Sequence, residues 1–280
     1  MRPAELVSLS SLSEVAGDYD LLLCDVWGVV HDGRVKSPPA EAALRAARAA
    51  GPKVVLVTNS PRPFAGVVAQ LDALNVSREA YDGIVTSGDA TRALIAAGPK
   101  KILHVGLDRD LDLYEGLGVE PVGEDEAEVV VVTGLVRDEE ETPADYADLL
   151  SRLAARGLPM ICANPDIVVH RGEKLIYCAG ALGQAYAALG GEVALAGKPH
   201  APIYQVALER SGLTDPRVLC IGDGLHTDVK GAATIGADVL FVQEGIHREE
   251  LAAFREDVAG LSRALADLGV EARYVMPELR

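Results

Sequence analysis

The sequence predicts an α/β protein built on a parallel sheet, and three observations support that fold class. Short apolar runs alternate with alanine-rich stretches of helical periodicity along the whole chain. The apolar runs are rich in Val, Ile and Leu without strict polar alternation, which is typical of parallel strands covered on both faces. With 280 residues, 49% of them hydrophobic and 24% charged, the chain has room for about two globular domains, and its composition excludes a disordered or coiled-coil protein.

Each predicted strand is one of these apolar runs. The runs are Tyr19–Asp25, Lys53–Thr58, Lys101–Val105, Glu128–Thr133, Leu158–Cys162, Arg217–Ile221, Ala237–Val242 and Ala272–Met276. A helix is expected over Pro39–Ala50, because Ser37 can cap its start and Gly51 follows its end. A second helix is expected over Thr142–Arg156, where Asp145 stands in the capping-box position.

Charge and hydropathy exclude several classes of partner. The chain carries 26 basic and 42 acidic residues, a net charge of −16, which repels nucleic-acid phosphates and anionic lipid. The longest uncharged run, Leu175 to Gly191, is too short to span a membrane, and the N-terminal segment lacks the apolar core of a signal peptide. We therefore expect a cytoplasmic protein that binds neither nucleic acid nor membrane.

The four cysteines, Cys24, Cys162, Cys178 and Cys220, show no C-x-x-C spacing. Each lies in or beside an apolar run, so we expect buried thiols rather than disulfides or metal ligands.

The candidate functional residues are those directly after the apolar runs, because ligands of open parallel sheets bind beyond the carboxyl ends of the strands. These segments are Asp25–Gly28, Thr58–Ser60, Asn164–Asp166, Gly197–Pro199 and Gly222–Gly224, with Asp228 just beyond.

Four of the candidates are carboxylates; Asp166 is one, and the other three lie at or just beyond the ends of two apolar runs. Asp25 and Asp223 end apolar runs, and Asp228 follows in the next helical segment. Converging carboxylates require a cation, and an all-oxygen ligand set favours Mg²⁺ over zinc.

The remaining candidates suit an anion. Lys198 lies in a rigid Gly-Lys-Pro turn, while Thr58 and Asn59 stand where a strand meets a helix and main-chain N–H groups are available. A strand-end Asp alone is usually a helix cap, and a Gly-Lys-Pro alone is usually a turn. Together, and in this order, the residues indicate phosphoryl transfer through an aspartyl-phosphate.

Four motifs also carry a family resemblance. They are DVWGVVHDG, VVLVTNS, GKPH and IGDGLHTDVKGA, with CANPD between the second and third. In this order they resemble the haloacid dehalogenase (HAD) superfamily, in the class IIA branch that includes 4-nitrophenylphosphatase-like and sugar-phosphatase-like proteins. The resemblance covers nearly the whole chain.

The resemblance implies a Rossmann-like core from residues 1–80 and 185–280, with an α/β cap inserted at residues 81–184. It also implies an Mg²⁺-dependent phosphatase that hydrolyses a small, sugar phosphate-like monoester through an aspartyl-phosphate. Because relatives of this class often dimerise through their caps, it further implies a homodimer.

Carried over residue by residue, the resemblance implies a role for each candidate. Catalysis falls to the nucleophile Asp25 and to Lys198. The residues that bind the phosphoryl group are Thr58, Asn59 and Lys198. The residues that bind the metal are Asp25, Trp27 through its main-chain carbonyl, Asp223 and, in a supporting role, Asp228. The residues that contact the rest of the substrate are Asn164 and Asp166.

Trp27 departs from the family pattern. Phosphatases of the superfamily usually carry a second Asp at this position as the general acid, a role worth about 10²- to 10⁴-fold in rate. His31 and Asp32 are the nearest replacements in sequence.

Two other functions stay open because of this change. One is a carbon–halogen hydrolase, whose halide leaving group needs no proton, although Asp223 and Asp228 indicate a metal that such enzymes do not use. The other is a phosphate-binding or regulatory protein with weak catalysis, although Asp25 and Lys198 are those of an enzyme.

Overall fold

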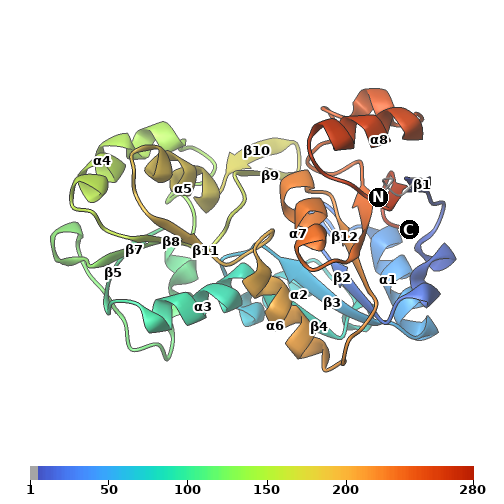
Figure 1. The fold of residues 1–280 in the computed structure, drawn as a ribbon. Helices are drawn as coiled ribbons and strands as arrows, with labels where there is room; N and C mark the ends of the chain where they lie inside the picture. Colours follow the sequence, from blue (N-terminus) through green and yellow to red (C-terminus); the bar gives the residue numbers. More distant parts are fainter. Residues whose placement is uncertain (1–5) are drawn as a thin grey trace. The chain divides into compact units, whose positions relative to one another are not determined.

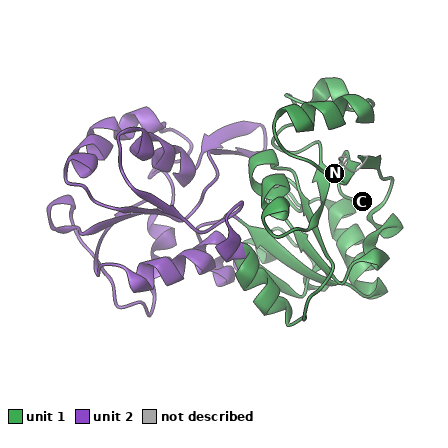
Figure 2. Ribbon diagram, in the orientation of Figure 1, with its two compact units in different colours: residues 1–58, 70–85, 204–280 green, residues 59–69, 86–203 purple. Residues whose placement is uncertain are grey.

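The computed structural model describes residues 6–280; the first five residues, part of the N-terminal segment considered above, lie outside it. The chain forms two compact units (Figure 2). Unit 1 comprises Met1–Thr58, Gln70–Val85 and Tyr204–Arg280, and unit 2 comprises Asn59–Ala69 and Thr86–Ile203. The predicted boundaries between core and cap, at 80/81 and 184/185, differ from these bounds and stay a prediction.

Unit 1 is built on a seven-stranded sheet (Figure 1). Its strand order is β1 (Val7–Ser8), β14 (Tyr274–Met276), β13 (Asp238–Val242), β12 (Val218–Gly222), β2 (Leu21–Cys24), β3 (Lys53–Thr58) and β4 (Gly83–Thr86). Strand β2 runs parallel to both neighbours, with Cys24 level with Ile221 of β12 and Leu56 of β3. All four β2 residues are buried, which explains an apolar run without polar alternation.

The helix predicted in unit 1, over Pro39–Ala50, is present and starts one residue earlier. The helices of this unit are α1 (Pro38–Ala50), α7 (Lys230–Thr234) and α8 (Val258–Asp267), and the unit boundaries fall within α2 (Phe64–Ala73) and α6 (Ala201–Ser211). Shorter helical turns lie at Leu12–Glu14, Ala16–Asp18, Arg78–Ala80, Leu225–Val229 and Ala252–Phe254. The Ser37 hydroxyl caps α1 by accepting a hydrogen bond from Ala40 N, and Gly51 is the C-cap.

Unit 2 holds a second, five-stranded parallel sheet. Its order is β11 (Val193–Leu195), β8 (Met160–Cys162), β7 (Val129–Val132), β5 (Lys101–Val105) and β6 (Glu120–Pro121). An antiparallel hairpin, β9 (Val168–Arg171) and β10 (Lys174–Tyr177), follows β8. The helices are α3 (Ser87–Ala97), α4 (Ala147–Ala155) and α5 (Ala179–Ala188), with short turns at Asp108–Tyr114, Glu124–Glu126 and Pro143–Tyr146.

Strand β7 shows why unit 2 has two cores. Val130 and Val132 pack into one buried cluster with residues of α4 and α5, whereas Val129 and Val131 pack into another with residues of α3 and the Asp108–Tyr114 turn. Successive strand residues face opposite sides of a sheet, so both faces of this one are covered. The expected capping box is also present: Thr142 N donates to Asp145 Oδ2, and the Thr142 hydroxyl accepts from Asp145 N.

The predicted α/β fold class with parallel sheets is therefore confirmed. All four cysteines are buried, and burial raises the pKa of the Cys162 thiol to about 12. Across residues 6–280, no helix combines the length and the apolar character that crossing a bilayer requires.

Candidate active site

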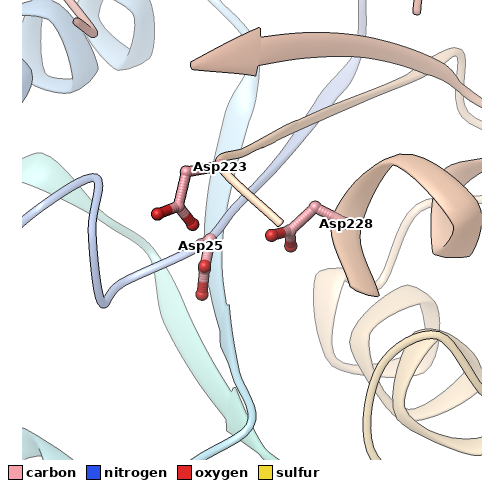
Figure 3. Close-up of side chains that lie close together, drawn as sticks. All are labelled: Asp25, Asp223 and Asp228. Atoms are coloured by element: carbon pink, nitrogen blue, oxygen red, sulfur yellow. The ribbon is translucent and has the colours of Figure 1, made fainter. Parts of the chain in front are cut away.

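Three buried carboxylates gather at the carboxyl edge of the unit 1 sheet. Asp25 directly follows β2, Asp223 directly follows β12, and Asp228 lies in the helical turn Leu225–Val229. One ligand oxygen from each lies within 4.8 Å of the others, and Figure 3 shows the three side chains close together. None is more than 8% exposed. Neighbouring parallel strands end side by side, so the strand order itself brings Asp25 and Asp223 together.

Main-chain N–H groups hold each carboxylate in place. Val26 N donates to Asp25 Oδ1 at 2.7 Å, Ile246 N donates to Asp223 Oδ2 at 2.7 Å, and Gly224 N donates to Asp228 Oδ2 at 3.1 Å. These bonds orient the carboxylates through the backbone of strand ends and tight turns, which are rigid parts of the unit.

Two glycines let the main chain approach Asp223 closely. A Cβ on Gly28 would lie 2.1 Å from Asp223 Oδ2, and one on Gly245 would lie 2.0 Å from the same oxygen. Gly28 also has φ +86°, a conformation that residues with a Cβ rarely adopt. Side chains at either position would displace the carboxylate.

The donor set fits a hard divalent cation. At the largest separation of 4.8 Å, two full negative charges repel each other by about 3 kcal/mol at an effective dielectric constant of about 20. A divalent cation bound between the carboxylates reverses the sign of that interaction. Because the cluster offers oxygen ligands alone, Mg²⁺ or Ca²⁺ suits it better than zinc.

Trp27 and the turn that follows it pack against each other in unit 1. The rings of Trp27 and His31 meet edge to face with centroids 5.1 Å apart. Gly33, with φ +87°, brings the chain back over the indole, where a Cβ would lie 2.5 Å from Trp27 Cζ2. The turn therefore holds the ring that stands where the family resemblance leads us to expect an acid. The metal role of the Trp27 carbonyl stays a prediction.

Neither expected replacement for that acid carries an ionisable proton at neutral pH. His31 is 3% exposed, burial lowers its pKa to about 4, and its Nδ1 accepts a hydrogen bond from Gly33 N at 2.9 Å. Burial raises the pKa of Asp32, but hydrogen bonds from Val35 N and Arg34 N outweigh burial, so the net pKa lies below its ordinary value. His31 is therefore neutral and Asp32 is ionised.

Four further candidates lie together in unit 2. The side-chain amide of Asn59 donates to Asp166 Oδ1 at 2.8 Å and to the Lys198 carbonyl at 3.1 Å, and it accepts from Lys198 N at 2.7 Å. Asp166 N in turn donates to Asn164 Oδ1 at 3.0 Å. Asn59, Asn164 and Lys198 are buried, and Asp166 is half-buried.

The last candidate, Thr58, ends β3 in unit 1 and is buried. The expected residues thus form two groups. Thr58 and the three carboxylates belong to unit 1, whereas Asn59, Asn164, Asp166 and Lys198 belong to unit 2. The peptide bond between Thr58 and Asn59 joins the two groups along the chain.

Sequence reasoning missed one feature of these sites and one buried carboxyl group of unit 2. The first is the turn at Gly245–Ile246, whose N–H fixes Asp223; it follows the apolar run Ala237–Val242, so the strand-end rule could have found it. The second is Asp110, 3% exposed in unit 2, where burial raises its pKa and the Thr133 hydroxyl and the Arg109 cation oppose that rise. Its acidic surroundings in the sequence, DRDLD, gave no sign of burial.

The chain is similar to known proteins along most of its length. The family model of haloacid dehalogenase-like hydrolases matches residues 22–120, and a second family model, described as HAD-hydrolase-like, matches residues 195–269. A crystal structure of a haloacid dehalogenase-like hydrolase from Brucella suis is 51% identical, covers 97% of this chain and 100% of its own, and has a TM-score of 0.88.

Two more distant relatives have named activities. The glycerol phosphate phosphatase of Mycobacterium tuberculosis, solved in complex with magnesium, is 27% identical over 95% of this chain and 77% of its own, with a TM-score of 0.70. The acid sugar phosphatase of Staphylococcus aureus is 27% identical over 81% of this chain and 88% of its own.

The carboxylate cluster predicts that a divalent cation stabilises the fold. Mg²⁺ at about 100 times its Kd adds roughly 2.7 kcal/mol, which for a chain of this size raises Tm by about 5 to 10 °C. Thermal unfolding at constant ionic strength, with and without Mg²⁺, measures the shift. Asp223→Asn keeps an acceptor for Ile246 N but removes a charge, so the shift should shrink strongly. Asp125→Asn, at an exposed acidic position, is the control and should keep the full shift; equal shifts in both variants would contradict a metal site at Asp223.

Burial of His31 predicts a loss of stability in mild acid. Its folded-state pKa of about 4 lies below the ordinary value of 6.5, so the unfolded chain takes up the proton first as the pH falls. The free energy of unfolding should therefore drop by about 2 kcal/mol more between pH 7 and pH 5 than it does in His31→Asn, which lacks the titrating ring. Urea unfolding of both proteins at the two pH values measures the difference, and parallel losses would show that His31 is not buried in its neutral form.

Proposed function

Because this chain belongs to the haloacid dehalogenase-like hydrolases, we propose that it is an Mg²⁺-dependent phosphatase acting on a small phosphomonoester. Among its relatives are a glycerol phosphate phosphatase and an acid sugar phosphatase. Glycerol phosphate and a sugar phosphate are both monoesters of a small polyhydroxylated molecule, and we propose a sugar or polyol phosphate as the substrate here.

The observation that carries this proposal is the buried group of Asp25, Asp223 and Asp228. Asp25 is the proposed nucleophile: one of its carboxylate oxygens attacks phosphorus as the bond from phosphorus to the ester oxygen breaks. Water then attacks the aspartyl-phosphate, releases inorganic phosphate and restores the carboxylate. A cation held by the three carboxylates and the Trp27 carbonyl would neutralise charge on the phosphoryl oxygens.

The other candidates bind the group that is transferred. We assign the Thr58 hydroxyl, the Asn59 segment and the Lys198 ammonium to the phosphoryl oxygens, because donors and a cation stabilise the charge that these oxygens share during transfer. Asn164 and Asp166 are proposed to contact the rest of the substrate. Burial of Lys198 and Thr58 supports this assignment, since charges and donors act more strongly away from water.

A phosphate-binding protein without turnover is the second candidate. Trp27 favours it, because the usual acid is missing and neither His31 nor Asp32 holds an ionisable proton at neutral pH. The carboxylate cluster weighs against the carbon–halogen hydrolase, because that chemistry needs no cation.

Hydrolysis of 4-nitrophenyl phosphate with and without Mg²⁺ tests the proposed function. Nitrophenolate leaves without a proton, so this ester requires only the nucleophile, the cation and the phosphoryl-binding groups. The wild type should turn it over in Mg²⁺, and Asp25→Asn should lower kcat by more than about 10³-fold while keeping the fold. Asp125→Asn, at an exposed position of unit 2, should match the wild type. Retained activity in Asp25→Asn would remove the covalent mechanism, and no turnover of any ester despite bound Mg²⁺ would favour the binding protein.

The missing acid makes a separate prediction about leaving groups. Trp27→Asp should raise kcat/KM for an alkyl ester such as glycerol phosphate at least about 10-fold more than for 4-nitrophenyl phosphate, because only the alkoxide needs a proton. Trp27→Phe removes the indole without adding an acid and should give no such difference. Equal gains for both esters would indicate a change in packing rather than a restored acid.

A further inference from the structure

We propose that the side chain of Asn59 is a positioning residue, which fixes the main chain of Lys198 and ties it to the Asn164–Asp166 loop. This inference rests on the proposed function, because it concerns how Lys198 is aimed. It departs from the expectation that the Asn59 side chain itself binds the phosphoryl group.

The hydrogen bonds of the Asn59 amide carry the argument. An amide nitrogen has two hydrogens, and here one goes to Asp166 Oδ1 and the other to the Lys198 carbonyl. The amide oxygen accepts from Lys198 N. With both hydrogens used inside unit 2, the side chain has no donor left for a phosphoryl oxygen, and a contact from Asn59 to that group falls to its main-chain N–H.

The Asn59 amide forms hydrogen bonds with both main-chain polar groups of Lys198. The N–H and the C=O of Lys198 pair with one side chain, as they would pair with a neighbouring strand. Holding both groups fixes the peptide planes on either side of the Lys198 Cα, and therefore the direction in which its side chain leaves the backbone.

The residue before Lys198 is shaped for this contact. A Cβ on Gly197 would lie 2.6 Å from Asn59 Oδ1 and 2.5 Å from Ser87 Oγ. A side chain at this position would push Asn59 away from Lys198, so the glycine is what allows the amide to reach the backbone.

Asp166 fixes the far side of the amide. Its carboxylate accepts one Asn59 hydrogen, and its own N–H donates to Asn164 Oδ1. Asn59 is 2% exposed and Lys198 is 3% exposed, so water cannot replace these bonds when they are lost. The loop after β8 and the loop after β11 are thus held to one side chain.

The expected catalytic effect is a loss in kcat. Lys198 is proposed to stabilise charge that grows in the transition state, and displacement of a catalytic group by about 1 Å costs on the order of 10²-fold in rate. A positioning residue acts through that group, so its removal should change kcat far more than KM.

The test exchanges the donor and acceptor between residues 59 and 166. Asn59→Asp keeps the acceptor for Lys198 N but removes both donors and faces the Asp166 carboxylate with a second one. In Asn59→Asp with Asp166→Asn, the new amide at 166 can donate to the carboxylate at 59. Asp166→Asn alone keeps an acceptor for Asn59, so its midpoint of urea unfolding should stay near that of the wild type. Asn75→Asp, at an exposed position in unit 1, is the matched control for the same chemical change.

We expect Asn59→Asp to lower kcat for 4-nitrophenyl phosphate about 10²-fold with KM changed less than about threefold. The double variant should recover at least about tenfold of that loss and most of the lost midpoint of urea unfolding. A direct phosphoryl contact would instead raise KM and weaken inhibition by inorganic phosphate in Asn59→Asp, and Asp166→Asn would not restore either quantity; that result overturns the proposal.

The unfolding midpoints separate this inference from the proposed function. If the double variant recovers no stability over Asn59→Asp, the pairing of residues 59 and 166 is wrong and the inference fails, whatever the activity. If stability is recovered but kcat never fell, Asn59 has only a structural role and the inference also fails. A wild type that turns over no ester, with the stability recovery intact, contradicts the proposed function and leaves the pairing supported.

Discussion

The repulsion between three buried carboxylates is the constraint on which unit 1 depends. Oxygens of Asp25, Asp223 and Asp228 lie within 4.8 Å of one another in a part of the unit with little water. Such an arrangement persists only if the surrounding main chain over-determines it. Strand order supplies the first part of that control, because β2 and β12 are neighbours and end together. Hydrogen bonds from Val26 and Ile246 and close approach at glycine supply the rest.

In unit 2 the residue that hydrogen bonds hold in place is basic rather than acidic. There the residue to be held is the buried Lys198. Its main chain is fixed by the side-chain amide of Asn59. In unit 1, by contrast, main-chain N–H groups fix the carboxylate side chains. In both units the functional residue follows a strand directly or within a few positions. The rigid sheet thus places the backbone, and one or two short hydrogen bonds set the final direction of the side chain.

The difference between a backbone placed by the sheet and a side chain directed by hydrogen bonds explains what could be predicted from the sequence. Strands β3 and β5 have their predicted bounds, and α1 starts within one residue of its predicted start, because apolar runs and caps are local signals. Strands β1, β4, β6 and β11 and the β9–β10 hairpin were not predicted, because each of these strands has only two to four residues and gives too short an apolar run. Asp25 and Asp223 could be found from strand ends alone. The partners of Asn59 could not, because Asp166 lies 107 residues away in sequence and the pairing exists only in the fold.

Hydrogen bonds and burial also decide which residues near Trp27 can act as an acid, the role that the family resemblance places at position 27. A general acid must carry an ionisable proton at working pH, and the turn from Trp27 to Val35 keeps His31 neutral and Asp32 ionised through burial and main-chain hydrogen bonds. Those contacts hold the turn closed over the indole, with Gly33 against the ring. If His31 or Asp32 took up a proton at the atom that accepts from the main chain, it would lose the hydrogen bonds that shape the turn. Restoring an acid at position 27 therefore means replacing the side chain around which the turn is packed.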